Sequence, residues 1–258
     1  MQRPKILISN DDGINADGIA ALATAMRKIG PVCVCAPQRD HSGASSSISL
    51  GKIRVKKIRD GEFSVAGTPA DSVHLALMAA GILPWKPDLT VTGINCGANL
   101  GEDTIYSGTV AAAIESALTG IPAVAFSLVP AAGAFPPTHF DDAALVAGEL
   151  VGKLLATDRC PADLLLSVNI PDLPRARMGS FVATRLGSRG ASRLPFCREK
   201  ELDGSSGVYS YTMHDGELAG EPGDDFHALA RSQIAVTPLT CDLTDSGPGQ
   251  EFVSTWLR

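Results

Sequence analysis

Short apolar runs alternate with helix-like segments through the first two thirds of the chain, and this alternation constrains the fold more than any other feature. The run over residues 5–8 is brief and rich in branched side chains, as in a buried parallel strand. Segment 16–28 then carries apolar residues at helical spacing and ends before Gly30. Repetition of strand, helix and strand predicts an α/β protein with a Rossmann-like, doubly wound and mainly parallel sheet.

The alternation predicts the remaining elements in turn. Strands are expected at 31–36, 89–92, 123–128 and 164–168, helices at 68–80, 109–118 and 141–156, and a hairpin at 52–58 and 62–65. Beyond Pro171 the rhythm breaks. Residues 175–225 favour an excursion of hairpins, followed by a last strand at 234–237 and a polar tail. We therefore divide the chain into a Rossmann-like core, 1–170, and a C-terminal extension with hairpins and oligomerisation elements, 171–258.

Composition excludes several classes of protein. The chain has 258 residues and a formal net charge of −6, which argues against a stable nucleic-acid partner. Its apolar stretches are too short to span a bilayer, so no membrane role is expected. The six cysteines lack zinc-site spacing and are expected to be reduced thiols. The first strand leaves no room for a signal segment before it, so we expect a cytoplasmic protein.

Two adjacent carboxylates, Asp11 and Asp12, directly follow the first apolar run. Ligands of open α/β sheets bind outside the carboxyl ends of the strands, where this pair is expected to lie. Neighbouring anions repel each other unless they share a proton or a cation, and none of the next five residues is Lys or Arg. The pattern favours a hard divalent metal ion. The alternative is that one Asp caps the following helix, although Asp17 could do so instead.

Other acidic pairs show that the pattern alone is weak. Asp141-Asp142 and Asp224-Asp225 are both expected to head helices, where capping and the helix dipole explain them. The first pair differs because a buried strand precedes it and because two further polar loops follow strands of the same sheet.

A glycine- and asparagine-rich loop over 93–108 follows the strand predicted at 89–92. Asn95 and Asn99 offer neutral oxygen ligands or amide donors at the same sheet edge. The glycines at 93, 97 and 101 match neither the dinucleotide fingerprint nor the Walker loop. A plain connecting loop would explain the glycines but explains the two amides less well.

Hydroxyl-bearing residues occupy two more positions of interest. Ser107, Gly108 and Thr109 lie directly before a helix, where free backbone N–H groups bind anions, although Ser107 could simply cap that helix. Ser42 follows the second strand and could contact a metal or phosphate, or be one more loop serine. The neighbouring His41 is a candidate proton carrier. Positive charge gathers in the C-terminal excursion, where a solvated surface is the first reading and an interface or phosphate clamp the second: Arg185, Arg189, Arg193, Arg198 and Lys200.

Together these segments closely resemble the SurE family, the survival-protein E nucleotidases. The resemblance is carried, in order along nearly the whole chain, by 8–13, 36–37 with 42–45, 67–71, 93–101, 106–113, 168–171, 237–239 and 242–244. It implies a Rossmann-like core and a metal-dependent phosphatase acting on nucleoside monophosphates. The products would be a nucleoside and phosphate; 3′-nucleotides and polyphosphate are further candidate substrates.

Carried over residue by residue, the resemblance implies one divalent cation per subunit, bound by Asp11, Asp12, Ser42 and Asn95. Asn99 and the turn formed by Ser107, Gly108 and Thr109 would hold the phosphate, so the expected catalytic residues are Asp11, Asp12, Asn99 and Ser107. Oxygen ligands favour Mg²⁺ or Mn²⁺, with Ca²⁺ as a third candidate. The resemblance also implies a homodimer or homotetramer in which C-terminal elements are exchanged.

In the expected mechanism the cation lowers the pKa of a water that attacks phosphorus in line. Covalent attack by Asp11 is a weaker variant. A signalling receiver module also places paired carboxylates after its first strand, but it needs a lysine after a later strand, and Val129-Pro130-Ala131 follows the strand at 123–128. A nucleotide- or phosphate-binding protein without turnover stays open as the alternative.

Overall fold

A nine-stranded sheet forms the centre of the protein in the computed structural model, which describes residues 3–131, 133–157, 160–189, 196–203, 206–211 and 220–257. The strand order is β3-β4-β2-β1-β5-β6-β7-β11-β8. The strands are β1 (Ile6–Ser9), β2 (Val32–Pro37), β3 (Val55–Arg59), β4 (Glu62–Val65), β5 (Leu89–Cys96), β6 (Ala123–Val129), β7 (Leu165–Pro171), β8 (Phe181–Ala183) and β11 (Ile234–Leu239).

The inner strands of this sheet are parallel, as the sequence predicts. β1 pairs with β2 and β5, and β5, β6 and β7 follow in parallel register. Among the described strands of this nine-stranded sheet, antiparallel pairing occurs only toward the two ends, between β3 and β4 and between β7 and β11. The chain builds the sheet outward in one direction through β2 and in the other through β5 to β7, so the order reverses between β1 and β5.

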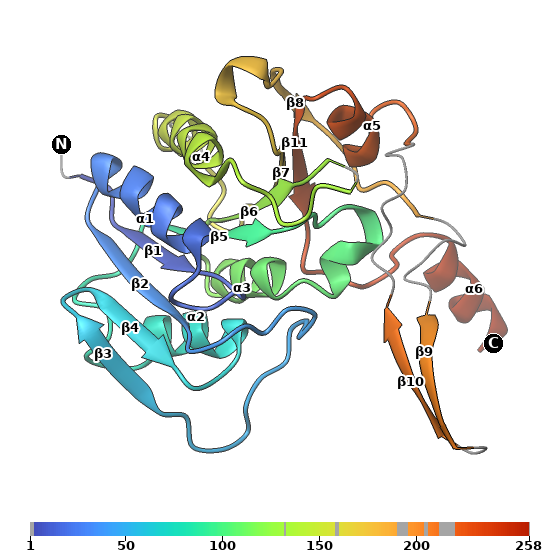
Figure 1. Ribbon diagram of the computed structural model, residues 1–258, viewed down its shortest axis with the longest axis horizontal. Coiled ribbons are helices and arrows are strands. Elements are labelled where there is room, and N and C mark those ends of the chain that lie inside the picture. Colours follow the sequence, from blue (N-terminus) through green and yellow to red (C-terminus); the bar gives the residue numbers. More distant parts are fainter. Residues whose placement is uncertain are drawn as a thin grey trace.

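Helices cover both faces of the sheet (Figure 1). α1 (Asp17–Ile29) packs beside α4 (Phe140–Leu155) on one face, and α2 (Pro69–Met78) packs beside α3 (Gly108–Ala117) on the other. The larger core cluster includes Ile8, Met26, Phe126 and Val146, all fully buried. Burial of each such side chain stabilises the fold by about 1.5–3 kcal/mol.

The structure adds elements that the sequence reading did not expect. The loop expected at 93–108 contains the end of β5 and a 3₁₀ helix, η1 (Gly101–Ile105). The expected polar tail contains α6 (Pro248–Trp256), whose first helical position is a proline, where the missing N–H costs nothing. A second short 3₁₀ helix, η2 (Arg175–Arg177), and the three-residue β8 are too short to give a periodic signal.

α5 (Asp225–Ala230) begins after Asp224, which caps it as expected.

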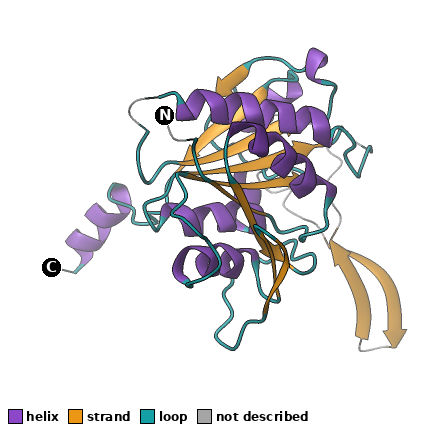
Figure 2. Ribbon diagram, turned by 90° about the vertical axis from the view of Figure 1, so that its left-hand side faces the viewer, coloured by secondary structure: helices purple, strands orange, loops and turns teal. Residues whose placement is uncertain are grey.

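The C-terminal part of the chain also forms a separate hairpin. β9 (Phe196–Asp203) and β10 (Ser206–Tyr211) pair antiparallel in a two-stranded sheet of their own, which confirms that the excursion contains a hairpin. Figures 1 and 2 both show this hairpin projecting away from the main sheet. None of the described helices is long and apolar enough to cross a membrane.

The loop between β2 and β3 is fastened to the start of α2 by Asp71. Its carboxylate accepts hydrogen bonds from the N–H (2.9 Å) and Oγ (2.6 Å) of Ser49 and from the N–H of Thr68 (2.8 Å). Thr68 completes a capping box by accepting from the Asp71 N–H at 3.1 Å. The same loop carries Ser42, so these hydrogen bonds anchor to α2 the loop that contributes Ser42 to the candidate site.

We expect Asp71→Asn to lower the free energy of unfolding by about 1–3 kcal/mol at pH 7, because hydrogen bonds to a buried carboxylate are lost. Burial opposes ionisation of Asp71, but the hydrogen bonds from Ser49 and Thr68 outweigh it and hold the pKa of this carboxyl below its usual value. A group with a lowered folded-state pKa stabilises above its unfolded pKa of about 4 and ceases to do so as the pH falls through the folded value. The melting temperatures of the two proteins should therefore converge as the pH falls from about 4 through the lowered pKa of Asp71.

Asp60→Asn is the matched control for this measurement. The Asp60 side chain is exposed and, among the described residues, pairs with Lys57 alone, so its replacement should leave the melting temperature almost unchanged. An equal loss of stability in the Asp71 and Asp60 variants would show that the hydrogen bonds of Asp71 do not stabilise the fold.

Candidate functional site

The Asp11-Asp12 pair lies where the order of the sheet reverses. β1 and β5 are neighbouring parallel strands; the pair follows the end of β1, and Asn95 is the penultimate residue of β5. Asp12 accepts a hydrogen bond on Oδ2 from the N–H of Cys96 at 3.1 Å, across the boundary between the two strands. Ligands of doubly wound proteins bind in this crevice. The structure therefore brings the acidic pair and the asparagine loop together.

Asp11 is almost fully buried, with 3% of its surface exposed, against the first turn of α3. Thr109 donates a hydrogen bond from Oγ1 to its Oδ1. A Cβ atom added at Gly108 would lie 2.7 Å from the Asp11 Cβ, so only glycine allows this approach. The carboxylate is thus held at the positive end of the α3 dipole.

Neither carboxylate of the pair acts as a helix cap. The N-cap of α1 is Ala16, which makes no side-chain capping bond, so the capping explanation of the pair is wrong. Among the described residues, neither Asp11 nor Asp12 forms an ion pair. Burial raises the pKa of Asp11, and burial together with the charge of Asp11 raises the pKa of Asp12 to about 7. The pair therefore lacks the positive partner that its ionised form requires.

The loop between β2 and β3, which carries Ser42, contacts the acidic pair at Asp11. His41 donates its N–H to the backbone oxygen of Asp11 at 2.8 Å. The N–H and Oγ of Ser42 both donate to Oδ1 of Asp40, at 2.7 and 2.6 Å. The charge of Asp40 also contributes to the raised pKa of both Asp11 and Asp12. Asp40 is a site residue that the sequence reading missed, although a carboxylate two positions before Ser42 was the available signal.

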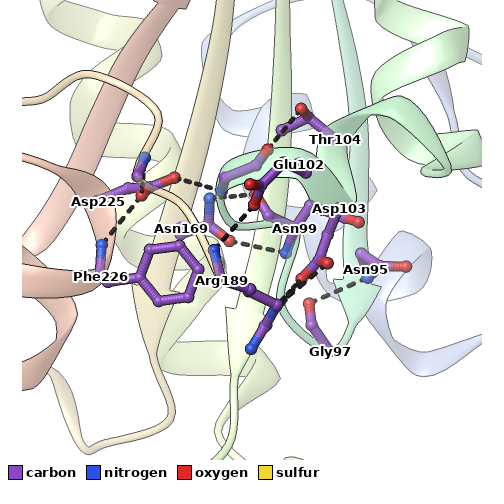
Figure 3. Close-up of polar contacts among 12 residues, drawn as sticks. Asn95, Gly97, Asn99, Glu102, Asp103, Thr104, Asn169, Arg189, Asp225 and Phe226 are labelled. Carbon is purple, nitrogen blue, oxygen red and sulfur yellow. Dashed lines mark hydrogen bonds and ion pairs between the residues drawn. The ribbon is translucent and has the colours of Figure 1, made fainter. Parts of the chain in front are cut away.

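Two asparagine side chains, that of Asn95 near the end of β5 and that of Asn99 in the loop after it, are fixed by hydrogen bonds (Figure 3). Asn95 donates from Nδ2 to the Gly97 oxygen at 3.0 Å, which leaves its amide oxygen as the available ligand atom. Asn99 donates from Nδ2 to Ser127 Oγ at 2.8 Å. Asn169 grips the peptide of Asn99 from both sides, accepting from its N–H at 3.0 Å and donating to its oxygen at 2.9 Å. From the sequence Asn169 is noted only within segment 168–171 of the family resemblance and is given no role in the site, although an amide inside an apolar strand was a usable signal.

The start of α3 offers an anion site and a cap at once. Ser107 Oγ accepts the Val110 N–H at 3.0 Å, so the capping reading of Ser107 is confirmed, while its hydroxyl proton stays free to donate. The N–H groups of Gly108 and Thr109 belong to the first helical turn and have no partner within the helix. Both the hydroxyl and the backbone N–H of Thr109 interact with the Asp11 carboxylate, so the N–H of Gly108 is the backbone donor of this turn that a ligand could take.

The oxygen atoms gathered here suit a hard cation. The set comprises two carboxylates, one hydroxyl and one amide oxygen, with no sulfur or imidazole ligand, which is the chemistry that Mg²⁺ and Mn²⁺ prefer. The described residues contain no group of three or more His, Cys, Asp or Glu side chains that could hold a metal. Neutral oxygens would therefore have to complete the coordination of any cation bound by the acidic pair.

The arginines of the excursion have separate outcomes. The Arg189 side chain is only 21% exposed and forms a two-pronged ion pair with Asp103, at 2.9 Å from Nε and 2.7 Å from Nη2 to Oδ2. The expectation of a solvated side chain is therefore wrong for it. Arg185 is exposed and donates to the Pro222 oxygen. Arg198 and Lys200 are exposed on β9, and Arg193 lies outside the described residues.

The fold and its site define the class: a doubly wound α/β protein with a cluster of acidic and other oxygen-bearing side chains at its switch point. The profile of the family described as "Survival protein SurE" matches residues 6–193. The chain belongs to the SurE family.

Individual relatives agree with this membership over the full length. A protein of Nitrosococcus oceani named 5′-nucleotidase SurE is 47% identical over 255 residues, which cover 98% of both chains. The 5′-nucleotidase SurE of Halorhodospira halophila is 46% identical over 98% of this chain and 97% of its own. The crystal structure of the SurE protein from Aquifex aeolicus superposes with a TM-score of 0.85 at 35% identity, covering 98% of this chain and 100% of that one.

Proposed function

We propose that this protein is a metal-dependent phosphomonoesterase that hydrolyses nucleoside 5′-monophosphates to nucleoside and phosphate. The observation that carries the proposal is the Asp11-Asp12 couple, which forms no ion pair within the described part of the chain and which lies against the end of β5 and the start of α3 at the switch point. The full-length relatives named 5′-nucleotidase SurE support the substrate class. Nucleoside 3′-monophosphates and polyphosphate are secondary candidates.

Asp11, Asp12, Ser42 and Asn95 would hold one divalent cation per subunit, with Mg²⁺ or Mn²⁺ as the best candidates and Ca²⁺ as the third. When bound, the cation supplies positive charge to the phosphate and lowers the pKa of a water molecule.

The residues of the chain then bind and orient the phosphate. Asn99 has a second amide hydrogen beyond the one given to Ser127, and Ser107 has a free hydroxyl proton. Together with the N–H of Gly108 they would donate to the non-bridging phosphate oxygens, where negative charge develops, while Thr109 would complete the turn and hold Asp11. The α3 dipole adds to this stabilisation. The catalytic set is therefore Asp11, Asp12, Asn99 and Ser107.

The direct test is phosphate release from AMP, GMP and their 3′ isomers with Mn²⁺ or Mg²⁺. We expect turnover that stops with excess chelator and returns when metal is added back. Tight nucleotide binding without phosphate release would instead support a non-catalytic nucleotide-binding protein. Single turnover in labelled water separates attack by water, which labels phosphate, from attack by Asp11, which leaves a phosphoenzyme.

We also propose a homodimer or homotetramer in which elements of residues 171–258 are exchanged. This is supported by the projecting β9–β10 hairpin and by the exposed apolar side chains of Phe252 and Trp256 in α6 and of Leu257 directly after it. Light scattering of the intact chain and of a variant ending at residue 246 tests it, since the shortened chain should form smaller assemblies.

The cytoplasmic location and the boundary between residues 170 and 171 stay predictions. The free thiols of Cys33, Cys35, Cys96, Cys160 and Cys241 are compatible with a reducing compartment.

We expect Asp40→Ala to weaken Mn²⁺ binding by about 10–100-fold, as loss of a group that orients a ligand commonly does. Asp40 accepts a hydrogen bond from the Ser42 hydroxyl, which leaves the lone pairs of the Ser42 oxygen available to a cation. The negative charge of Asp40 also attracts the cation. Calorimetric titration with Mn²⁺ measures the change. Asp17→Ala, which removes an exposed carboxylate from the first turn of α1, is the control. Equal affinity of the Asp40 variant and the native protein would rule out this role.

A further inference from the structure

The loop that carries Asn99 is held from the far side by residues of the C-terminal third of the chain (Figure 3). Asp225, at the start of α5, is fully buried, with 0% of its surface exposed. Its Oδ2 accepts the N–H of Gly101 at 2.8 Å, and its Oδ1 accepts the N–H of Gly187 at 2.8 Å and of Phe226 at 3.0 Å. No cation pairs with Asp225 among the described residues, so backbone N–H groups stabilise its charge.

The three consecutive residues Asn99, Leu100 and Gly101 are each fixed by a different contact. Asn169 grips the peptide of Asn99, and Asp225 holds the N–H of Gly101. Between them the fully buried Leu100 packs in a cluster with Phe226 and Leu229 of α5. Two of the three contacts therefore come from α5, which is more than 120 positions further along the chain.

The backbone at Gly101 leaves no room for adjustment. Its φ is +51°, and an added Cβ would lie 2.6 Å from the Gly187 oxygen and 2.9 Å from the Phe226 ring. Beyond it, Arg189 forms its two-pronged ion pair with Asp103 of η1 and lies over the Phe226 ring, 5.0 Å from its centre. The segment from Gly187 to Arg189 thus joins α5 to the loop at both Gly101 and η1.

We propose that Asp225 is a positioning residue for catalysis: by fixing the Gly101 peptide it sets the placement of the Asn99 amide against the phosphate. This inference rests on the proposed phosphatase function. Asp225 touches neither the proposed cation ligands nor the reacting atoms, so it acts only through the loop. Arg189 supports the same loop from η1. A displacement of the Asn99 amide by about 1 Å would be enough to cost up to about 100-fold in rate.

The test compares Asp225→Asn with Asp224→Asn. Both residues are buried at the start of α5, but Asp224 bonds to the N–H groups of Glu221 and His227 and does not contact the Asn99 loop. The Asp225 variant retains size but loses charge and presents an amide to a backbone N–H. We expect kcat/KM for AMP to fall about 10–100-fold, mainly through kcat, with Mn²⁺ affinity unchanged. The Asp224 variant should keep native kinetics even where its melting temperature falls.

Hydrogen exchange gives a reading independent of turnover. Amide exchange in peptides covering 97–106 should speed up at least about tenfold in Asp225→Asn and not in Asp224→Asn. Native kinetics with native exchange in Asp225→Asn would overturn the proposal, as would equal kinetic losses in both variants. If Asp225→Asn does not fold, Arg189→Lys replaces it. Arg189→Lys loses the two-pronged ion pair with Asp103, and it should show a smaller fall in kcat/KM and a smaller rise in amide exchange. Native kinetics and native exchange in this variant would count against the proposal.

The experiment distinguishes failure of the proposed phosphatase function from failure of the proposed role of Asp225. A native protein that binds Mn²⁺ and AMP but releases no phosphate removes the phosphatase proposal. The exchange measurement and the affinity for inorganic phosphate would still show whether Asp225 positions the loop.

Discussion

Asp12→Asn should lose phosphate release from AMP by on the order of 10²–10³-fold or more while keeping its fold. The substitution preserves the size of the side chain and an oxygen to accept the Cys96 N–H. It removes one of the two negative charges offered to the cation, so Mn²⁺ binding weakens and the phosphate loses its positive partner. Because burial and Asp11 disfavour the ionised form of Asp12, removing its charge relieves repulsion and should leave the melting temperature of the metal-free protein unchanged or raised.

Asp141→Asn provides the control for Asp12→Asn. Asp141 also belongs to an Asp-Asp pair, but it is exposed in the first turn of α4. Its replacement should leave turnover and Mn²⁺ affinity unchanged and cost less than about 1 kcal/mol through the helix dipole. Full activity of Asp12→Asn at limiting Mn²⁺ would eliminate the proposed cation site.

The acidic pair could be located from the sequence because the local pattern determines its position. A short branched run predicts a buried strand, and the residues after such a strand lie at the carboxyl edge of a parallel sheet. The same reasoning placed Asn95 beside the pair, and the hydrogen bond from Cys96 to Asp12 confirms that neighbourhood. Ser42 was a weaker prediction because a loop serine has no distinguishing local signal.

The residues that hold the site were beyond local reasoning because their partners are distant in the chain. Asn169 grips a peptide 70 positions away, and Asp225 binds the Gly101 N–H 124 positions away. Spacing along the chain does not reveal such contacts. Arg189 was read as surface charge because its partner, Asp103, lies 86 positions earlier. α6 was read as tail because its apolar side chains are exposed rather than packed into the core.

Gly108→Ala should reduce phosphate release by about 10²-fold, although glycine to alanine inside a helix usually stabilises by about 0.5–1 kcal/mol. The new Cβ would lie 2.7 Å from the Asp11 Cβ, 2.9 Å from its Oδ2 and 3.0 Å from Cγ of Pro69. Asp11 cannot retreat freely, because Thr109 holds its carboxylate and His41 holds its backbone oxygen. The start of α3 and the acidic pair must therefore move apart, which disturbs cation binding and phosphate binding together.

Gly148→Ala in α4 separates this effect from the general effect of adding a methyl group to a helix. A Cβ at Gly148 would meet no atom within 4 Å, so this variant should keep full activity and melt at the same or a higher temperature. The decisive comparison is the pair of Mn²⁺ affinities. Gly108→Ala should bind Mn²⁺ at least about tenfold more weakly than Gly148→Ala, because Asp11 is displaced from the other ligands. If both alanine variants hydrolyse AMP at the native rate, the close approach of α3 to Asp11 has no part in catalysis.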